Sequence, residues 1–300
     1  MASSESPFEA AVDAIVSGDL ATLRQLLRDQ PALIHARSTR AHRSTLLIYT
    51  AANGVENDRQ ITPPNIVEIA RELLEAGAEV DAEGEIYGGS TTLGLAATSI
   101  HPERAGVQND LMQLLLDHGA RLDHPGAAGN QHSLVAGCLA NGRGKAAAYI
   151  AARGATLDLE GAAGVGRLDV VRGFFDNDGT LKPMATAEQL RRGFAWACEF
   201  GRTEVVRWLL DHGMRVDTPP PQAEPTGLHW AAFGGHADVV ALLLERQAPV
   251  DVVEARFNGT PLSWALHGQS EAPPEDRERF AGVVAMLRRA GATVNDRPGG

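Results

Sequence analysis

The sequence is poor in cysteine, in aromatic residues and in long apolar runs. Two cysteines among 300 residues, Cys138 and Cys198, make no disulfide framework, so a reducing, cytoplasmic compartment is expected. No apolar run approaches the roughly 18 residues that a membrane span needs. The first eight residues contain neither a basic segment nor an apolar core, so no signal peptide is predicted.

Basic residues are scarce relative to acidic ones. The chain has 27 Lys and Arg residues against 38 Asp and Glu residues, a formal net charge of −11. Nucleic-acid phosphates and anionic membrane surfaces attract basic faces, so we expect neither as a partner.

Motifs for metals and cofactors are missing as well. Paired Cys and His residues at zinc-ligand spacing do not occur. There is no Gly-x-x-x-x-Gly-Lys-Ser/Thr loop, and no Gly-x-Gly-x-x-Gly opens a helix after a strand. The sequence therefore predicts no metal site and no cofactor.

The chain does contain a repeated unit. Three tryptophans occur at intervals of 34 residues: Trp196, Trp230 and Trp264. Each stands in a short apolar segment such as Leu228-His-Trp-Ala-Ala232. A fixed period between 20 and 50 residues indicates a solenoid of stacked units. A second regular feature is a Gly-Ala-x-Val-Asp motif, in which a left-handed glycine ends a helix. It occurs, with variation, from Gly77, Gly119, Gly154, Gly213, Gln247 and Gly291.

Together these features resemble the ankyrin repeat, as in bacterial ankyrin-repeat proteins. Each unit has a first helix near Thr-Pro-Leu-His-x-Ala-Ala, a glycine stop, a second helix rich in Val and Leu, and the Gly-Ala-x-Val-Asp exit. The resemblance covers nearly the whole chain. It implies an all-α solenoid of about eight helix-turn-helix repeats, including atypical caps. We expect a single array over residues 1–300, with an N-terminal cap at 1–37, internal repeats at 38–252 and a C-terminal cap at 253–300.

The repeat pattern predicts eight first helices and irregular segments between them. The predicted helices are Ala11–Ser17, Ile48–Gly54, Leu93–Ser99, Ala136–Gly142, Leu159–Val165, Phe194–Phe200, Leu228–Gly234 and Leu262–Gly268. Residues 56–64 and 100–107 are insertions within the second and third repeats, and the sequence leaves their order open. Tyr87 and His101, with nearby hydroxyl groups, are expected near one end of the groove. Function tends to lie in such departures from a repeat pattern.

The first helices also predict which side chains line a concave groove. At 100° per residue, Leu228, Ala231 and Ala232 share the face that packs on the second helix, so Trp230 and Phe233 point into the groove. Equivalent positions make one half of the groove aromatic and the other half polar. The aromatic half contains Trp196, Trp230, Phe233 and Trp264; the polar half contains Asn53, Thr98 and Asn141, with Tyr49 on the hairpin side. The tryptophans would either stack on a ligand or pack on neighbouring repeats.

The fifth repeat has glycine at both groove positions. Gly161 and Gly164 each destabilise a helix by roughly 1 kcal/mol relative to alanine. Such a cost suggests that space is needed there, which favours a hollow beside Trp196. The alternative is that the repeat sequence has decayed. Glu160 and Glu199 flank this place. Burial would raise their pKa values and suit them to general acid–base catalysis, whereas solvated groove carboxylates would have no such role. His267 is a third catalytic candidate in the same groove.

Two functions from different classes follow. The first is a module that binds a protein partner, basic or amphipathic, through the concave groove and the hairpin tips. The alternative is a small-molecule-binding protein or an enzyme (an acid–base isomerase, cyclase, lyase or hydrolase) with a pocket at Gly161 and Gly164 beside Trp196. A purely structural spacer fits less well, because a spacer needs no groove chemistry.

Overall fold

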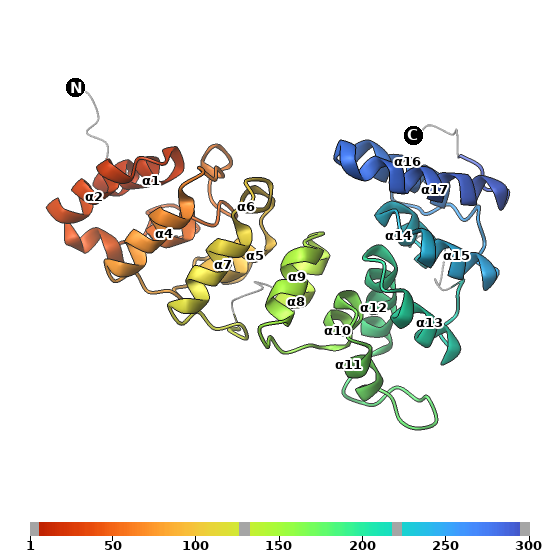
Figure 1. Ribbon diagram of the computed structural model, residues 1–300. Coiled ribbons are helices and arrows are strands. Elements are labelled where there is room, and N and C mark those ends of the chain that lie inside the picture. Colours follow the sequence, from red (N-terminus) through yellow and green to blue (C-terminus); the bar gives the residue numbers. More distant parts are fainter. Residues whose placement is uncertain (1–5, 126–132, 218–223, 295–300) are drawn as a thin grey trace. The chain divides into compact units, whose positions relative to one another are not determined.

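The computed structural model describes residues 6–125, 133–217 and 224–294. Its regular elements in these ranges are all helices, joined by turns and irregular segments with three isolated bridges (Figure 1). This confirms the predicted all-α solenoid. The chain divides into two compact units, Met1–Thr156 and Leu157–Gly300. A single array over all 300 residues stays a prediction. Among the described residues, no helix has the length and apolar character needed to cross a membrane.

The first unit contains four helix pairs in two layers. Each inner helix contacts the next inner helix, and each outer helix contacts the next outer helix. The inner helices are α1 (Pro7–Ser17), α3 (Leu46–Tyr49), α5 (Thr92–Thr98) and α8 (Leu134–Ala140), and the outer helices are α2 (Leu20–Asp29), α4 (Ile66–Glu75), α7 (Gln108–Asp117) and α9 (Gly144–Ala151). Three shorter elements, η1 (Pro31–His35), η2 (Asn57–Arg59) and α6 (Ile100–Arg104), complete the unit. The last two lie in the two insertions, which are therefore ordered.

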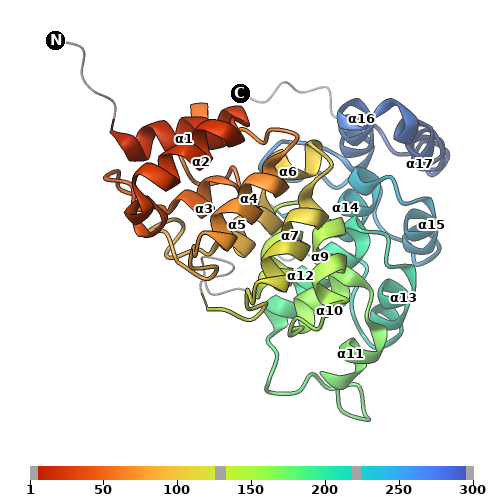
Figure 2. The ribbon, with the colours of Figure 1, turned by 60° about the vertical axis from the view of Figure 1, so that its left-hand side comes forward.

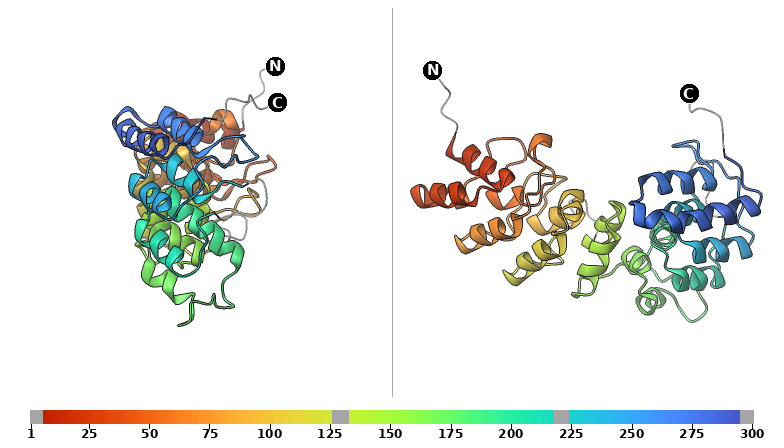
Figure 3. Two further views of the ribbon diagram at one scale, coloured as in Figure 1. Left: turned by 90° about the vertical axis from the view of Figure 1, so that its right-hand side faces the viewer. Right: turned by 45° about the horizontal axis from the view of Figure 1, so that its top comes forward.

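The second unit repeats the same two-layer arrangement. In Figure 2 the outer helices α13, α15 and α17 form one column beside the inner helices α12 and α14, and in Figure 3 the blue helices α16 and α17 run side by side. The inner helices are α10 (Leu159–Val165), α12 (Ala187–Glu199), α14 (Gly227–Gly234) and α16 (Pro261–Glu271). The outer helices are α11 (Leu168–Gly173), α13 (Thr203–Asp211), α15 (Ala237–Glu245) and α17 (Arg277–Arg289), with η3 (Pro274–Asp276) before the last.

Seven of the eight predicted first helices occur in the described structure, most of them with shifted ends. The eighth, Ile48–Gly54, shares only Ile48 and Tyr49 with α3, because the chain turns after Tyr49 and Ala52 is left-handed (φ 48°). The helix at Leu159–Val165 matches the prediction, because Asp158 caps its start and Gly166 (φ 85°) ends it. The prediction for α12 was too short by seven residues at its start. There Thr186 and Gln189 form a reciprocal capping box, which begins the helix at Ala187. The tryptophan register gave no signal for these two extra turns.

Small residues on the inner helices allow the layers to pack closely. Leu228, Ala231 and Ala232 of α14 are almost completely buried in the core, whereas Trp230 and Phe233 keep part of their surface exposed. The predicted core face of this helix is confirmed, and the concave groove stays a prediction. Tyr49 differs from its expected place on the groove. It has no exposed surface and packs edge-on against Phe8 and His42 in the core of the first unit.

The exit motif places a left-handed residue after six of the eight outer helices in the described structure, and α2 and α11 lack it. At this position after α13 stands Gly213 (φ 94°), and after α15 stands Gln247 (φ 61°). A side chain in the left-handed region is strained, while glycine is not. A Cβ at Gly213 would meet no atom within 4 Å, so the cost of a side chain there is conformational.

We predict opposite effects from exchanging these residues. Gln247→Gly should raise the free energy of unfolding by about 0.5–1 kcal/mol, and Gly213→Ala should lower it by about 1 kcal/mol, because each change alters the strain of a left-handed residue. Urea denaturation followed by circular dichroism measures both. A loss of stability in Gln247→Gly would contradict the conclusion that the left-handed backbone of Gln247 is strained.

Candidate functional site

An apolar pocket of about 400 Å³ lies on the second unit. It is lined mainly by aromatic side chains from α14, from α16 and from the hairpin before α16. We call it the aromatic pocket, and its principal residues are Trp230, Phe233, Phe257, Ser263, Trp264 and His267. The sequence predicted four of these as site residues: Trp230, Phe233, Trp264 and His267.

Trp264 is the centre of the aromatic pocket. Its ring meets those of Trp230, Phe233 and Phe257 edge to face, at centroid distances of 5.1, 5.9 and 6.1 Å. His267 stacks on Phe233 at 6.1 Å. Edge-to-face contacts stabilise aromatic pairs beyond the burial of their area, so the pocket walls support one another.

A buried carboxylate shapes the hairpin that carries Phe257. Glu254 has no exposed surface, and it accepts hydrogen bonds from the backbone N–H groups of Arg256 (2.7 Å), Phe257 (2.9 Å) and Gly259 (3.1 Å). The Trp264 indole Nε1 donates to the same carboxylate at 3.4 Å. Burial by itself would raise the pKa of Glu254, but these donors hold the pKa below its usual value. The charged carboxylate therefore fixes Phe257 beside Trp264.

A buried histidine links this hairpin to the preceding repeat. His229 Nδ1 accepts a hydrogen bond from the backbone N–H of Thr226 at 3.1 Å, so Nε2 donates to the carbonyl of Gly259 at 3.2 Å. Burial lowers the pKa of His229 and keeps the ring neutral. His229 thus has a structural role beneath the pocket.

Trp196 does not belong to the aromatic pocket. It is buried in α12 with 8% of its surface exposed, and no ring contact joins it to Trp230 in the described part of the chain. The structure therefore assembles two of the three tryptophans that the 34-residue register brought together.

Gly161 and Gly164 are buried in α10, which packs on α12. This contact is tight: a Cβ on Gly193 of α12 would lie 3.1 Å from the Ala163 Cβ and 3.3 Å from the Leu159 carbonyl oxygen. Neither Gly161 nor Gly164 lines the aromatic pocket. The hollow beside Trp196 stays a prediction.

The two candidate carboxylates lie in different surroundings. Glu160 is 1% exposed, and its Oε1 lies 3.2 Å from Nη2 of Arg192. Burial raises the pKa of Glu160 to about 7, although Arg192 acts in the opposite direction. Glu199 is half-buried, and burial also raises its pKa to about 7. His267 is exposed at the rim of the aromatic pocket. Among the described residues no contact joins these three candidates.

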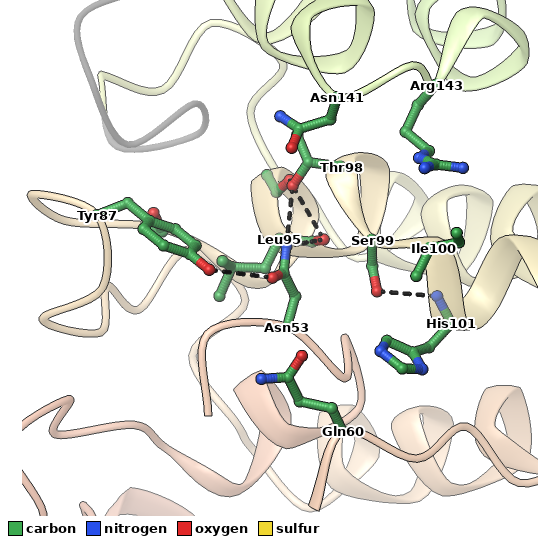
Figure 4. Close-up of a pocket in the computed structure, with 12 residues that line it drawn as sticks. Asn53, Gln60, Tyr87, Leu95, Thr98, Ser99, Ile100, His101, Asn141 and Arg143 are labelled. Atoms are coloured by element: carbon green, nitrogen blue, oxygen red, sulfur yellow. Dashed lines mark hydrogen bonds between the residues drawn. The ribbon is translucent and has the colours of Figure 1, made fainter. Parts of the chain in front are cut away.

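A second pocket, of about 430 Å³, lies on the first unit (Figure 4). Asn53, Thr98 and Asn141 line it, so the structure brings together the three polar residues that the repeat register selected. We call it the polar pocket; its other principal polar residues are Gln60, Tyr87, His101 and Arg143. In residues 6–125, 133–217 and 224–294, no group of three or more His, Cys, Asp or Glu side chains is placed to hold a metal ion.

Sequence reasoning missed Phe257, Gln60 and Arg143. Each lies in an irregular segment outside the repeated helix positions: Phe257 in the hairpin before α16, Gln60 after η2, and Arg143 between α8 and α9. Two sequence signals were available: Gln60 belongs to the insertion at residues 56–64, and Phe257 is a large apolar residue in a loop-like segment.

Comparison with known families identifies the repeats of the second unit. Residues 159–254 and 194–272 match the family described as ankyrin repeats (3 copies). No curated protein matches the chain. A solved structure, the crystal structure of the human ASB11 ankyrin repeat domain, is 19% identical, with 96% of this chain and 99% of that chain covered and a TM-score of 0.41. Residues 159–272, in the second unit, therefore contain ankyrin repeats. Ankyrin repeats are in general modules for protein–protein interaction.

The raised pKa of Glu160 predicts a pH-dependent effect of Glu160→Gln. A folded-state pKa of about 7, against an ordinary value of 4.5, means that folding favours the protonated acid. Its stability contribution is therefore lost as pH rises from 4.5 to 7. The substitution Glu160→Gln should therefore change the free energy of unfolding more favourably at pH 8 than at pH 5. The difference between the two pH values should be up to about 3 kcal/mol.

Chemical denaturation at the two pH values measures this difference. Glu204→Gln, which removes an exposed carboxylate from α13, is the control and should shift stability equally at both pH values. An effect of Glu160→Gln that does not change with pH would show that the Glu160 carboxyl is ionised in the fold at pH 5.

Proposed function

We propose that the second unit binds a protein partner by accepting an apolar side chain of that partner in the aromatic pocket. The observation that carries this proposal is the pocket itself: about 400 Å³ of apolar space with Trp230, Trp264 and an exposed Phe257 at its walls. Tryptophan dominates the energetics of many protein interfaces, because it buries a large rigid surface at small entropic cost. The pocket volume lies in the range of roughly 300–1,000 Å³ that is usual for ligand-binding pockets in proteins.

The charge of the chain suggests the character of the partner. A net charge of −11 favours association with a basic or amphipathic segment, which would approach faster than a neutral one. The partner segment would therefore combine one large apolar residue with flanking Lys or Arg residues. We also propose a cytoplasmic location, which the two free, buried cysteines support.

The alternative of a small-molecule site or an enzyme at Gly161 and Gly164 has less support. Glu160 and Glu199 have raised pKa values, as an acid–base role requires. However, Glu160 is closed off from solvent and pairs with Arg192, so a substrate has no direct access to it. The aromatic pocket is open and preorganised, and it is the better-supported site.

Phe257→Ser tests the proposed partner site. A phage-displayed library of random peptides, selected on the full chain, should yield peptides that share a large apolar residue with nearby basic residues. Phe257→Ser should weaken their binding by roughly tenfold or more, because an aromatic wall of the pocket is lost. Isothermal titration calorimetry measures the affinity.

Met184→Ser is the matched control. Met184 belongs to the same unit, is 70% exposed and does not line the pocket, so its replacement should leave the affinity unchanged. Equal losses in both variants, or selected peptides without an apolar residue, would rule out the aromatic pocket as the binding site. Thermal denaturation of each variant verifies that the fold is retained.

A further inference from the structure

The polar pocket of the first unit is built by the two insertions that interrupt the repeat pattern. Gln60 follows η2 in the first insertion, and His101 lies on α6 in the second. Figure 4 shows Gln60 and His101 along one side of the pocket, Asn141 and Arg143 along the opposite side, and Tyr87 at one end. An uninterrupted repeat would lack both the Gln60 and the His101 walls.

The first insertion is anchored on both sides. Arg59 of η2 pairs with Glu9 and, at 2.9 Å, with Asp13, both on α1. Gln60 Nε2 donates a hydrogen bond to the Val55 carbonyl at 2.8 Å. These contacts hold the Gln60 side chain at the pocket edge, and they leave its Oε1 without a donor among the described residues.

The second insertion is anchored by a buried amide. Gln108 is 5% exposed, and its Nε2 donates to the carbonyls of Ala96 (3.0 Å), Ala97 (3.2 Å) and Ser99 (3.1 Å). These bonds fix the turn from α5 into α6. Arg143 of the next repeat pairs with Glu103 of α6, which ties α6 to the start of α9. The wall that carries His101 is therefore held in place before any ligand arrives.

Hydrogen-bond acceptors and donors of the protein remain available to a ligand in the polar pocket. Asn53 is engaged, since its Nδ2 donates to the Leu95 carbonyl (3.2 Å) and to Thr98 Oγ1 (3.1 Å). Asn141 Nδ2 donates to the Gly137 carbonyl at 2.8 Å, and its Oδ1 has no donor among the described residues. On the donor side, the guanidinium of Arg143 lines the pocket.

Tyr87 supplies an aromatic face at the edge of the same pocket. It is 62% exposed in a hairpin and has a left-handed backbone (φ 50°). Its hydroxyl lies 3.4 Å from Asn53 Oδ1, to which it donates a hydrogen bond. The negative face of the ring attracts polarised C–H groups of a ligand.

We propose that the polar pocket binds a neutral saccharide, with a pyranose ring against Tyr87. Sugar hydroxyls both donate and accept, so one kind of group can donate to Gln60 Oε1 and Asn141 Oδ1 and accept from the Arg143 guanidinium. The Arg143 charge is balanced by Glu103, so the site has no excess charge that favours an anion. A volume of about 430 Å³ is sufficient for a small polar ligand. This site is separate from the aromatic pocket and does not depend on the proposed partner.

The experiment uses the full chain and a panel of free hexoses, N-acetylhexosamines and their disaccharides. Saturation-transfer NMR should detect binding of at least one sugar, with the strongest transfer to ring C–H protons. Tyr87→Ala should weaken that binding roughly tenfold, the effect of losing about 1.4 kcal/mol of interaction. Asn141→Ala should weaken it as well. Tyr149→Phe, which removes a tyrosine hydroxyl outside the pocket, should leave it unchanged.

Two further arms distinguish the outcomes. Glycopeptides that carry the same sugar distinguish a glycan on a protein from a free sugar, and binding of either form through Tyr87 supports the proposal. Phe257→Ser should leave sugar binding intact, so failure of the partner proposal does not affect this one. The proposal is overturned if no sugar in the panel binds, if Tyr87→Ala and Asn141→Ala bind as tightly as the native chain, or if free carboxylates bind in place of the neutral sugars.

Discussion

The structure depends on the close packing of small and branched apolar side chains between successive helix pairs. In the second unit, Leu159, Ala162 and Ala163 of α10 recur as Leu228, Ala231 and Ala232 of α14, and all are buried. No pair could bury its apolar face alone, so each repeat is stabilised by its neighbours. This constraint fixes the core positions of each inner helix. The inner-helix positions that face away from the core and the connecting segments are free to differ between repeats, and the side chains particular to this chain stand there.

In both pockets, a buried and hydrogen-bonded side chain fixes an irregular segment that lines the pocket. A buried polar group is costly unless its hydrogen-bonding capacity is satisfied, and once satisfied it fixes the backbone around it. Glu254 accepts three backbone N–H bonds and sets the hairpin that carries Phe257. Gln108 donates to three carbonyls and sets the turn that carries His101. Irregular segments that are anchored in this way become rigid enough to line a site.

Sequence periodicity predicted the parts of the structure that obey the repeat. The helix pairs and the left-handed exits follow from local pattern, and the 34-residue register correctly placed Trp230 beside Trp264. It could not place Phe257 or Arg143, because their positions depend on how irregular segments fold back onto the helices. Tyr49 was misplaced for a related reason. The short helix α3 turns that residue inward, where burial of a large ring outweighs its exposure in the groove.

The substitution of glutamate for histidine at the fifth repeat can be understood in the same terms. His229 connects its own helix start to the next hairpin through Gly259, and it is buried as a neutral ring. Glu160 stands in the corresponding place in the repeat, yet its partner is Arg192 on the neighbouring inner helix. The cost of burying the carboxylate competes with the attraction of a half-exposed guanidinium, and the raised pKa shows that the burial cost is the larger of the two. The second carboxylate oxygen has no hydrogen-bond partner in the described structure, so Glu160 anchors its repeat less firmly than His229 does. A closed, incompletely satisfied acid between two packed helices accounts for the altered titration without any substrate. The chemistry that faces solvent lies in the aromatic pocket and the polar pocket, and recognition by this protein is therefore expected there.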